Sequence, residues 1–407
     1  MSSDSTPQPR IAIIGGGLGG LALLLTLHRR GVPATLYERD TGFNARAHLG
    51  GSLDLGWKSG QRALRENGLQ DEFDENSRPE GDEMRICDGA GKVHLKLGSK
   101  GEDGAAAQGP EDVRPEIDRT VLRKLLLDAV PPHLIQWGHA LSSVSAVDNG
   151  RHELTFANGF VTICDFLVGA DGANSRVRPL VSPATPIYLG VNGAEISLAP
   201  ETTKLPALAE TIANVGKGTM MAMHDSQLLG AQVNGDGRIR TYAWLRVAES
   251  WTIPSGPAEA KAVLREHFAG WPQWMLNLID HCDEGAIYPR ALWTLPVGHS
   301  WAHVSRVTLI GDAAHLMSPF AGAGANLALL DGLELGIVLA GLQEQGRLGD
   351  ASTVAEAVEA FEENMCAMAG RVADKANKTL AACVGPNTPQ AAIRRFGEMA
   401  AGGEREG

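Results

Sequence analysis

The fold is decided by a stretch near the N-terminus, Ile11-Ala12-Ile13-Ile14-Gly15-Gly16-Gly17-Leu18-Gly19-Gly20. It begins with a short apolar run of the kind that a strand buried on both faces requires, and the glycines at positions 15, 17 and 20 have the spacing G-x-G-x-x-G. A helical pattern then covers residues 21–30, and residues 33–37 predict a second strand that ends at Glu38. The stretch therefore predicts a βαβ unit that binds a dinucleotide.

Each glycine of this turn has a physical role. Gly15 permits the tight turn out of the strand, Gly17 lets a pyrophosphate approach the backbone, and Gly20 lets helix and strand pack closely. The free N–H groups at the start of the helix attract the phosphate charge. Glu38 is expected to accept hydrogen bonds from the adenosine ribose, and a carboxylate there disfavours a 2′-phosphate. The site therefore fits FAD or NAD better than NADP.

Two later stretches also place a glycine and an aspartate directly after a buried strand. The first is Phe166–Gly169 followed by Asp171-Gly172, and the second is Val307–Ile310 followed by Gly311-Asp312, with Pro319 and Gly322–Asn326 beyond it. Taken alone, each also fits an ordinary turn into a helix capped by Asn174, Ser175 or Asp312. Three such sites in one chain indicate one extended cofactor that is held at both ends, which points to FAD.

The rest of the chain predicts a second, sheet-based part. Residues 228–233 and 238–247 alternate in the manner of strands, a helical piece covers residues 258–274, and residues 119–130 predict another helix. Residues 101–112 predict an exposed loop, and an Ala/Glu-rich helix over residues 354–382 is expected to close the chain. The fold class is therefore α/β: a Rossmann-like FAD-binding domain with a sheet-based substrate domain and a long C-terminal helix. The expected boundaries are 1–185 and 290–345 for FAD binding, 186–289 for substrate, and 346–407 for the C-terminal helix.

Composition argues against several classes of protein. With 43% hydrophobic and 21% charged residues the 407-residue chain is typical of globular proteins, and a net charge of −12 argues against nucleic acid as a partner. The cysteines have no CxxC spacing, so the sequence indicates neither a disulfide framework nor a metal site. The apolar runs 21–27 and 333–342 are too short to span a bilayer, and residues 1–10 lack a signal core, so we expect a cytoplasmic protein without stable membrane insertion.

With these motifs the chain resembles the group A flavoprotein monooxygenases, the family of FAD-dependent aromatic hydroxylases. In that family a GxGxxG, a DG and a GD motif follow one another, as they do here at residues 15–20, 171–172 and 311–312. Within the family the chain is most similar to the tetracycline-inactivating monooxygenases. That similarity rests on residues 50–55, 59–61, 115–119 and 311–320. The resemblance implies FAD as cofactor, NADPH as co-substrate and O₂ as oxidant.

The resemblance also implies roles for individual residues. Glu38 and Arg39 would lie at the adenosine end of FAD, Asp54 and Arg119 along its middle, and Asp171 and Asp312 near the ribityl and pyrophosphate groups. The turn after Pro319, at Gly322, Gly324, Ala325 and Asn326, would offer backbone N–H groups to the pyrimidine edge of the flavin, where they stabilise negative charge. Arg46 would help to receive NADPH.

The resemblance is weaker at the substrate pocket, for which it implies Thr219, Met221, Arg240, Phe320 and Gly322. A Gln, an Arg and a His that face the drug in the tetracycline enzymes correspond here to Gly193, Thr219 and Arg240, so an altered preference is expected. No protein side chain is assigned a catalytic role, because the flavin performs the chemistry.

The expected function is NAD(P)H- and O₂-dependent hydroxylation of a fused-ring phenolic or enolic small molecule, either tetracycline-like or a polyketide. Two alternatives stay open at this point. A flavin oxidase or dehydrogenase would share GxGxxG but is not expected to carry the DG and GD motifs in this order. A non-catalytic protein that binds planar polyphenols is the other alternative.

Overall fold

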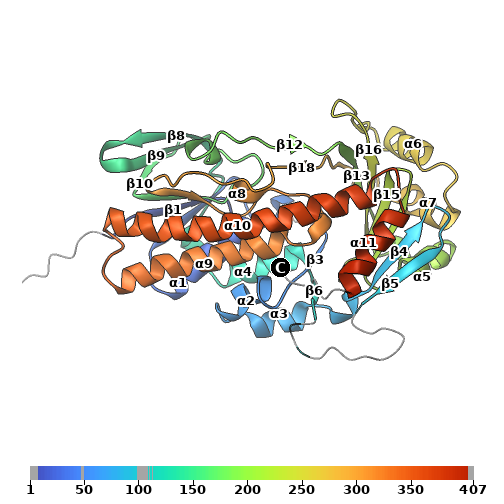
Figure 1. Ribbon diagram of the computed structural model, residues 1–407, viewed down its shortest axis with the longest axis horizontal. Coiled ribbons are helices and arrows are strands. Elements are labelled where there is room, and N and C mark those ends of the chain that lie inside the picture. The colour runs from blue at the N-terminus through green and yellow to red at the C-terminus, as the bar shows by residue number, and fades with distance from the viewer. Residues whose placement is uncertain (1–7, 47–49, 99–108, 110, 112, 402–407) are drawn as a thin grey trace, which may run out of the picture.

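The computed structural model describes residues 8–46, 50–98, 109, 111 and 113–401. The molecule is elongated, with a parallel sheet toward one end and a larger sheet at the other, and helix α10 (Ala351–Cys383) runs along the long axis between them (Figure 1). The predicted exposed loop at residues 101–112 lies almost entirely outside the described residues.

In the described part of the chain, the first part of the molecule is built on a parallel five-stranded sheet in the order β19-β11-β1-β2-β7. The central strand β1 pairs with β11 on one side, with Ile14 opposite Gly169, and with β2 on the other. Its burial on both faces matches the continuous apolar pattern of the sequence. The strands are β1 (Ile11–Ile14), β2 (Ala34–Glu38), β7 (Ile135–Trp137), β11 (Phe166–Gly169) and β19 (Val307–Leu309).

Helices α1 (Leu18–Arg29), α4 (Arg119–Asp128) and α9 (Gly324–Glu344) pack with this sheet. Helices α1 and α9 touch closely because glycines remove side chains at their crossing: a Cβ on Gly332 would lie 2.5 Å from the Gly19 carbonyl oxygen. Helix α9 has 21 residues and is apolar enough to cross a membrane, which the sequence pattern did not predict, but 72% of its most apolar window is buried inside the protein. Burial against the protein explains its composition without a membrane. Shorter helices α2 (Gly60–Arg65), α3 (Gln70–Asn76) and α8 (Asp312–His315) complete this part.

The second part is a seven-stranded sheet, again counted over the described residues, in the order β17-β13-β16-β15-β14-β4-β5. One face packs on helices α5 (Ala209–Val215), α6 (Pro257–His267) and α7 (Gln273–Asp280). The other face is turned toward the C-terminal helices and the turn at Phe320. Strands β4 and β5 come from before residue 186, so two separate segments of the chain build this sheet. The strands are β4 (Met84–Asp88), β5 (Val93–Leu97), β13 (Val191–Leu198), β14 (Thr219–His224), β15 (Gln227–Val233), β16 (Ile239–Arg246) and β17 (Tyr288–Pro289).

Small sheets join the two parts. Strand β3 (Ser52–Asp54) pairs with β6 (Glu116–Asp118), and β12 (Ile187–Tyr188) pairs with β18 (Trp293–Thr294). An antiparallel sheet of β8 (Leu141–Val147), β9 (Arg151–Phe156) and β10 (Val161–Cys164) lies at the end of the molecule away from the larger sheet (Figure 1).

Two expected helices differ from the structure. The helical piece at residues 258–274 is two helices, α6 and α7, because Gly270 takes a positive φ of 86° and Pro272 begins a new helix. The long helix α10 does not close the chain: helix α11 (Gln390–Ala401) follows it and packs against β5. The Gly385-Pro386 break ends α10, and the amphipathic pattern beyond it was missed.

Candidate flavin and substrate site

The three glycine-containing turns meet at one edge of the parallel sheet. Strands β1, β11 and β19 are neighbours, and their carboxyl ends deliver Gly15, Asp171 and Gly311. A Cβ built on Gly15 would lie 3.0 Å from the Cα of Asp171, so the first two turns touch. Ligands of open α/β sheets bind beyond the carboxyl ends of the strands. The three motifs lie at one edge of the sheet, which is consistent with the expectation that they form one site.

The first turn has the geometry that a pyrophosphate requires. Gly15 has a φ of 110°, and a Cβ on Gly20 would lie 2.1 Å from the Gly15 carbonyl oxygen, so neither position accepts a side chain. Gly17 is different: it is the N-cap of α1, and a Cβ there would have no heavy atom within 4 Å. The space beside Gly17 and the N–H groups of α1 therefore form a cradle that fits the pyrophosphate of a dinucleotide.

Glu38 is buried at the end of β2, beside this cradle. Its Oε2 accepts a hydrogen bond from the Gly16 N–H at 2.5 Å, and its Oε1 accepts one from the Asp40 N–H at 2.9 Å. These bonds hold the carboxylate in place, and its remaining lone pairs can still accept from ribose hydroxyls. Arg39 follows it and is exposed.

The Gly311-Asp312 turn is held by a carboxylate that the sequence did not single out. Asp331 on α9 is buried, and its Oδ2 accepts from the Gly311 N–H at 2.9 Å and from His315 Nε2 at 2.7 Å. Burial lowers the pKa of His315, but the Asp331 carboxylate, together with the charge of Asp312, outweighs burial and raises this pKa above its ordinary value. Asp331 therefore fixes the backbone that presents Asp312.

Arg178 joins the second and third turns. Its buried guanidinium donates to the Ala313 carbonyl at 2.8 Å, the Ala173 carbonyl at 2.8 Å and the Asp312 carbonyl at 3.1 Å. The hydroxyl of Ser175 accepts from the Val177 and Arg178 N–H groups, directly before the 3₁₀ helix η6 (Arg178–Leu180). Asp171 Oδ2 accepts from the Arg176 N–H at 2.6 Å, while its buried Oδ1 has no hydrogen-bond partner among the described residues.

Asp312 is exposed and is the first residue of α8, whose N-cap is Gly311. Asp312 is therefore not the N-cap residue, although its charge lies in the first turn of α8. We expect Asp312→Ala to lower the affinity for FAD by about ten- to a hundredfold, because a charge-assisted hydrogen bond contributes about 1.5 to 3 kcal/mol. The flavin content after dialysis and the dissociation constant from flavin fluorescence measure this. Unchanged flavin content would remove Asp312 from the cofactor site.

The turn at the start of α9 lies against strand β3. A Cβ on Gly322, which has a φ of 62°, would lie 3.3 Å from Asp54 Oδ1, and Gly324 has open space beside it. Burial raises the pKa of Asp54, although Arg114 Nε lies 3.0 Å from its Oδ2 and opposes the shift. Pro319 and Phe320 form the 3₁₀ turn η9 (Pro319–Ala321) directly before Gly322. The first backbone N–H groups of α9, at Gly324 and Ala325, thus start beside Asp54.

The side chain of Asn326 has a structural role that sequence reasoning missed. It is buried, its Nδ2 donates to the Asp54 carbonyl at 2.8 Å, and its Oδ1 accepts from the Gly56 N–H at 2.8 Å, the Ser59 hydroxyl at 3.0 Å and the Gly60 N–H at 3.2 Å. Asn326 therefore anchors the loop after β3 to the start of α9.

For two predicted cofactor residues, Arg119 and Arg46, the structure shows a position in the chain but, among the described residues, no polar side-chain contact at the predicted site. Arg119 begins α4 and is exposed, with its side chain against Gly50: a Cβ there would lie 2.7 Å from Arg119 Cδ. Arg46 is the last residue of η1 (Phe43–Arg46), and its side chain lies outside the described residues. Its role toward NADPH stays a prediction.

The expected substrate residues gather on one face of the seven-stranded sheet. Residues opposite one another on antiparallel strands share a face, and the pairs Thr219–Gln232, Met221–Gly230, Gln232–Arg240 and Gly230–Tyr242 link them across β14, β15 and β16. On this face Tyr242 stacks on Trp244 with their ring centroids 5.0 Å apart. The ring centroids of Trp244 and Phe320 are 5.3 Å apart. The structure thus brings Thr219, Met221, Arg240 and Phe320 together and adds Trp244, which the sequence analysis missed.

Arg240 is held by an acidic partner. Glu195, buried and opposite Tyr242 on β13, accepts hydrogen bonds from Arg240 Nη1 and, at 2.7 Å, from Arg290 Nε. Gly193 on the same strand cannot carry a side chain, because a Cβ there would lie 1.9 Å from the Ala243 carbonyl oxygen. Arg240 is therefore paired within the protein, and position 193 offers no polar side chain to this face.

Comparison with known proteins decides the family. Residues 9–351 match the family described as FAD binding domain. The chain belongs to this family of group A flavoprotein monooxygenases. The monooxygenase therefore uses FAD, and NADPH is the co-substrate typical of the family.

Individual relatives agree with this assignment over nearly the whole monooxygenase. "Monooxygenase penA" of Penicillium thymicola is 30% identical, with 88% of this chain and 91% of that protein covered. The solved structure of Klebsiella pneumoniae HpxO with FAD and uric acid shares the fold with a TM-score of 0.75 at 20% identity, covering 98% of this chain and 95% of that chain. Tetracycline destructase Tet(51) shares it with a TM-score of 0.70 at 19% identity, covering 97% and 96%.

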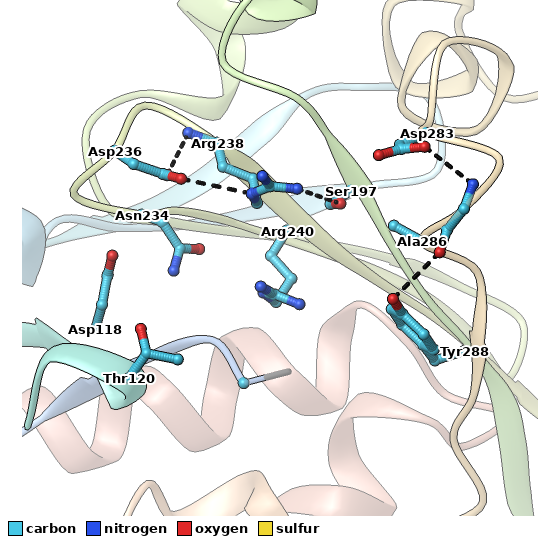
Figure 2. Close-up of a pocket in the computed structure, with 12 residues that line it drawn as sticks. Asp118, Thr120, Ser197, Asn234, Asp236, Arg238, Arg240, Asp283, Ala286 and Tyr288 are labelled. Carbon is cyan, nitrogen blue, oxygen red and sulfur yellow. Dashed lines mark hydrogen bonds and ion pairs between the residues drawn. The ribbon is translucent and has the colours of Figure 1, made fainter. Parts of the chain in front are cut away.

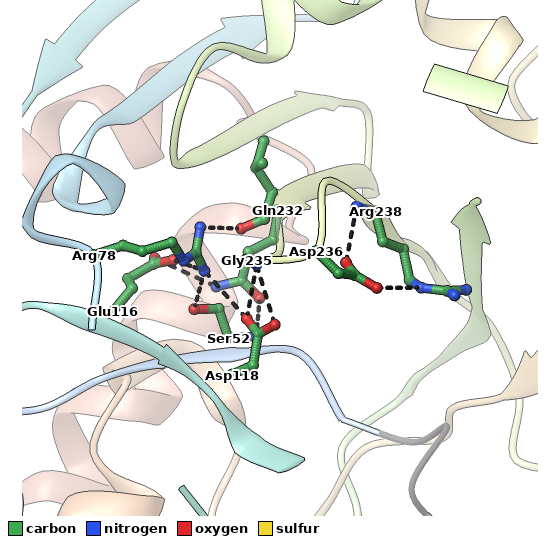
Figure 3. A network of polar contacts seen from close by, with 9 residues as sticks. Ser52, Arg78, Glu116, Asp118, Gln232, Gly235, Asp236 and Arg238 are labelled. Carbon is green, nitrogen blue, oxygen red and sulfur yellow. Dashed lines mark hydrogen bonds and ion pairs between the residues drawn. The ribbon is translucent and has the colours of Figure 1, made fainter. Parts of the chain in front are cut away.

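A partly buried polar network joins the two parts of the monooxygenase beside this site (Figure 3). Arg78 Nη2 donates to the Ser52 hydroxyl at 3.0 Å and to Asp118 Oδ1 at 3.2 Å, and Gln232 Oε1 accepts from the Ser52 N–H at 3.1 Å. Glu116 lies among them, opposite Asp54 on the β3–β6 pair, with its Oε2 3.6 Å from Arg78 Nη2. The network fixes the β3–β6 pair against β15 of the larger sheet.

Glu116 gives this network a pH dependence. Burial raises the pKa of Glu116 to about 7, against the opposing effects of Ser52, Arg78 and Gln232, and the charge of Asp54 raises it further. The protonated form is thus favoured in the folded state. Its contribution to stability is complete below about pH 4.5 and is lost as the pH rises through 7.

We therefore expect Glu116→Gln, which keeps the neutral shape, to gain stability relative to the parent as the pH rises from about 5 to about 8. The expected gain is on the order of 2 kcal/mol. Urea unfolding at several pH values measures it. A constant difference between the two proteins across this range would show that Glu116 ionises normally.

Proposed function

We propose that this monooxygenase hydroxylates a fused-ring phenolic or enolic small molecule, of tetracycline-like or polyketide type, with NAD(P)H and O₂. The observation that carries the proposal is the aromatic wall of Tyr242, Trp244 and Phe320, because Phe320 belongs to the turn that leads into the flavin site at Gly322. A planar aromatic substrate that stacks on this wall lies beside the site where the flavin ring is expected.

Different residues of this chain would bind different groups of FAD. The open space at Gly17 and the start of α1 would take the pyrophosphate, Glu38 the adenosine ribose, and Asp312 the ribityl or pyrophosphate region. The N–H groups at Gly324 and Ala325 would face the pyrimidine edge and stabilise negative charge there. When bound, FAD supplies the redox chemistry that takes electrons from NAD(P)H and activates O₂.

The protein itself orients the substrate and keeps water away. Met221 and the aromatic wall would exclude water from the ring, and Arg240, held by Glu195, would donate hydrogen bonds to a phenolic or enolic oxygen. The Tyr242 pKa is raised to about 12, chiefly by burial, so its hydroxyl stays protonated and can also donate. We also propose that Arg46 helps to receive NADPH. We further propose that the reaction takes place in the cytoplasm.

The proposal includes a changed preference relative to the tetracycline enzymes. Gly193 excludes a polar side chain, and Thr219 is short, so hydrogen bonds that those enzymes make would be missing. Each lost bond is worth about 0.5 to 1.5 kcal/mol, so tetracycline turnover would fall by about one to two powers of ten.

The test is a screen of phenols, anthraquinones and tetracyclines for stimulation of NADPH oxidation, with the masses of the products. We expect a fused-ring phenol or enol to stimulate oxidation and to gain one oxygen atom. Hydrogen peroxide as the sole product would favour a flavin oxidase, and absence of flavin reduction by NADPH with any ligand would favour a binding protein. Turnover of tetracycline as efficient as by a tetracycline destructase would contradict the changed preference.

A further inference from the structure

Asp54 lies against the turn that is expected to face the flavin. A Cβ on Gly322 would lie 3.3 Å from Asp54 Oδ1 and 3.6 Å from Oδ2, so the carboxylate borders the backbone that leads into α9. The main-chain carbonyl of Asp54 accepts from Asn326 Nδ2 at 2.8 Å, which fixes the end of β3 against the same turn. A carboxylate therefore has a defined place beside the N–H groups that we propose for the pyrimidine edge.

Arg114 brings a positive charge to this carboxylate. Its Nε lies 3.0 Å from Asp54 Oδ2 in an ion pair, and the segment that carries it leads directly into β6, the strand paired with β3. Arg114 Nε has no hydrogen-bond partner among the described residues, so the contact is one between charges and not an aligned hydrogen bond. The side chains of Arg114 and Asp54 are 25% and 38% exposed, so solvent screens the pair only in part.

A second ion pair beside β6 has no such contact with the flavin turn. It lies at a pocket of about 330 Å³ whose lining contains neither Asp54 nor Arg114 (Figure 2). There Arg238 Nε lies 3.6 Å from Asp236 Oδ2, with side chains 29% and 52% exposed. Of these two pairs, only Arg114–Asp54 touches Gly322. Arg238 is therefore a comparable arginine at which the effect of position can be separated from the effect of charge.

Reduction of the flavin makes the charge of Arg114 important. A hydride from NADPH brings two electrons and one proton to FAD and leaves NADP⁺, so the flavin gains one negative charge. An unbalanced carboxylate beside that charge opposes reduction, and a guanidinium paired with the carboxylate offsets this effect. One unit charge in a partly buried site changes such an equilibrium by about tenfold.

We propose that Arg114 is a positioning residue that sets the reduction potential of bound FAD. Through its ion pair it holds the Asp54 carboxylate in place and balances the negative charge beside the pyrimidine edge. This inference rests on the proposed function in one respect, the placing of that edge at Gly324 and Ala325. An ion pair that served only to pack the segment before β6 would affect stability and leave the potential unchanged.

The test is the reduction potential of the FAD-loaded protein at neutral pH, measured without oxygen by equilibration of the flavin with a reference dye and followed by absorbance. Arg114→Gln should shift the equilibrium for two-electron reduction about tenfold toward oxidised flavin, which corresponds to a potential lower by about 30 mV. Arg114→Lys keeps the positive charge and should stay within about threefold of the parent. The control Arg238→Gln removes an equal charge and should also stay within about threefold.

Asp54→Asn tests the same balance with the opposite sign. It removes the carboxylate and leaves the charge of Arg114 unpaired, so the equilibrium should shift toward reduced flavin by about tenfold. This variant decides the matter if Arg114→Gln does not fold by circular dichroism or does not retain FAD.

Several results would overturn this role of Arg114. They are a potential that is unchanged or higher in Arg114→Gln, an equal fall in Arg114→Lys or Arg238→Gln, and a potential in Asp54→Asn that does not rise. If one of these is found while the parent oxygenates a fused-ring phenol, the proposed function stands without this role. If the potentials shift as predicted and no fused-ring compound is oxygenated, the proposed substrate is wrong and the role of Arg114 stands.

Discussion

Gly17→Val should yield a folded protein that contains no flavin. Gly17 has a φ of −77° and a ψ of −178°, which valine adopts easily, and a Cβ there meets no heavy atom within 4 Å. The branched side chain would instead occupy the space that the pyrophosphate needs at the start of α1. We expect FAD affinity to fall by about three powers of ten, because several phosphate hydrogen bonds of about 1.5 kcal/mol or more are lost together. The flavin absorption of the purified protein and calorimetric titration with FAD measure this.

Gly341→Val is the matched control for this substitution. Gly341 lies within α9, where a Cβ also meets nothing within 4 Å, and the position is outside the predicted cofactor site. This variant should keep its flavin. A normal flavin spectrum in Gly17→Val would refute the assignment of the N-terminal turn, whereas unfolding of that variant would refute the open cradle.

Asn326→Ala should destabilise the protein by at least about 3 kcal/mol, since removal of a partner from each buried polar group costs about 1 to 3 kcal/mol. The substitution would leave the Gly56 and Gly60 N–H groups and the Asp54 carbonyl without the side chain that now pairs with them. Urea unfolding of the flavin-free protein measures the loss without any contribution from the cofactor.

A second variant, Asn326→Asp, separates the acceptor role of this side chain from its donor role. It keeps the oxygen that accepts from Gly56, Ser59 and Gly60, but its second oxygen can donate to the Asp54 carbonyl only while the buried carboxyl is protonated, so its loss of stability should grow as the pH rises. If Asn326→Ala were as stable as the parent and only its flavin affinity fell, the side chain would act on the cofactor and not on the loop after β3.

The sequence predicted the features that depend on local patterns. The apolar runs before Gly15, Asp171 and Gly311 predicted three buried strands; the structure confirms these strands and shows that they are neighbours in one sheet. Short turns after strands are recognisable because the residue types that they need are few. The family assignment followed from the order of these turns and is confirmed.

Features that depend on contacts between distant segments were not predictable. Arg178 and Asp331 hold the turns at Gly172 and Gly311 through bonds to residues 134 and 20 positions away in the chain. A single arginine or aspartate in a helix or turn carries no signal for such a role. Glu116 has a raised pKa because it is buried, and it is buried only after the β3–β6 pair packs on the larger sheet. The apolar run in helix α9 was judged too short because Glu334 interrupts it. In the structure the helix continues through Glu334, whose Oε1 lies 3.1 Å from Arg62 Nη1 in an ion pair with another part of the chain.

The most direct test of the central claim is a reaction of the FAD-loaded protein with NADPH, a fused-ring phenol that stimulates NADPH oxidation, and isotopically heavy O₂ in ordinary water. Comparison with the reverse labelling, heavy water and ordinary O₂, identifies the source of any added oxygen. We predict a product heavier by one oxygen atom that carries the label from O₂, together with one molecule of NADPH consumed for each product formed. A product that carries the label from water, or consumption of NADPH with hydrogen peroxide as the only oxygen-derived product for every fused-ring compound, would contradict the account.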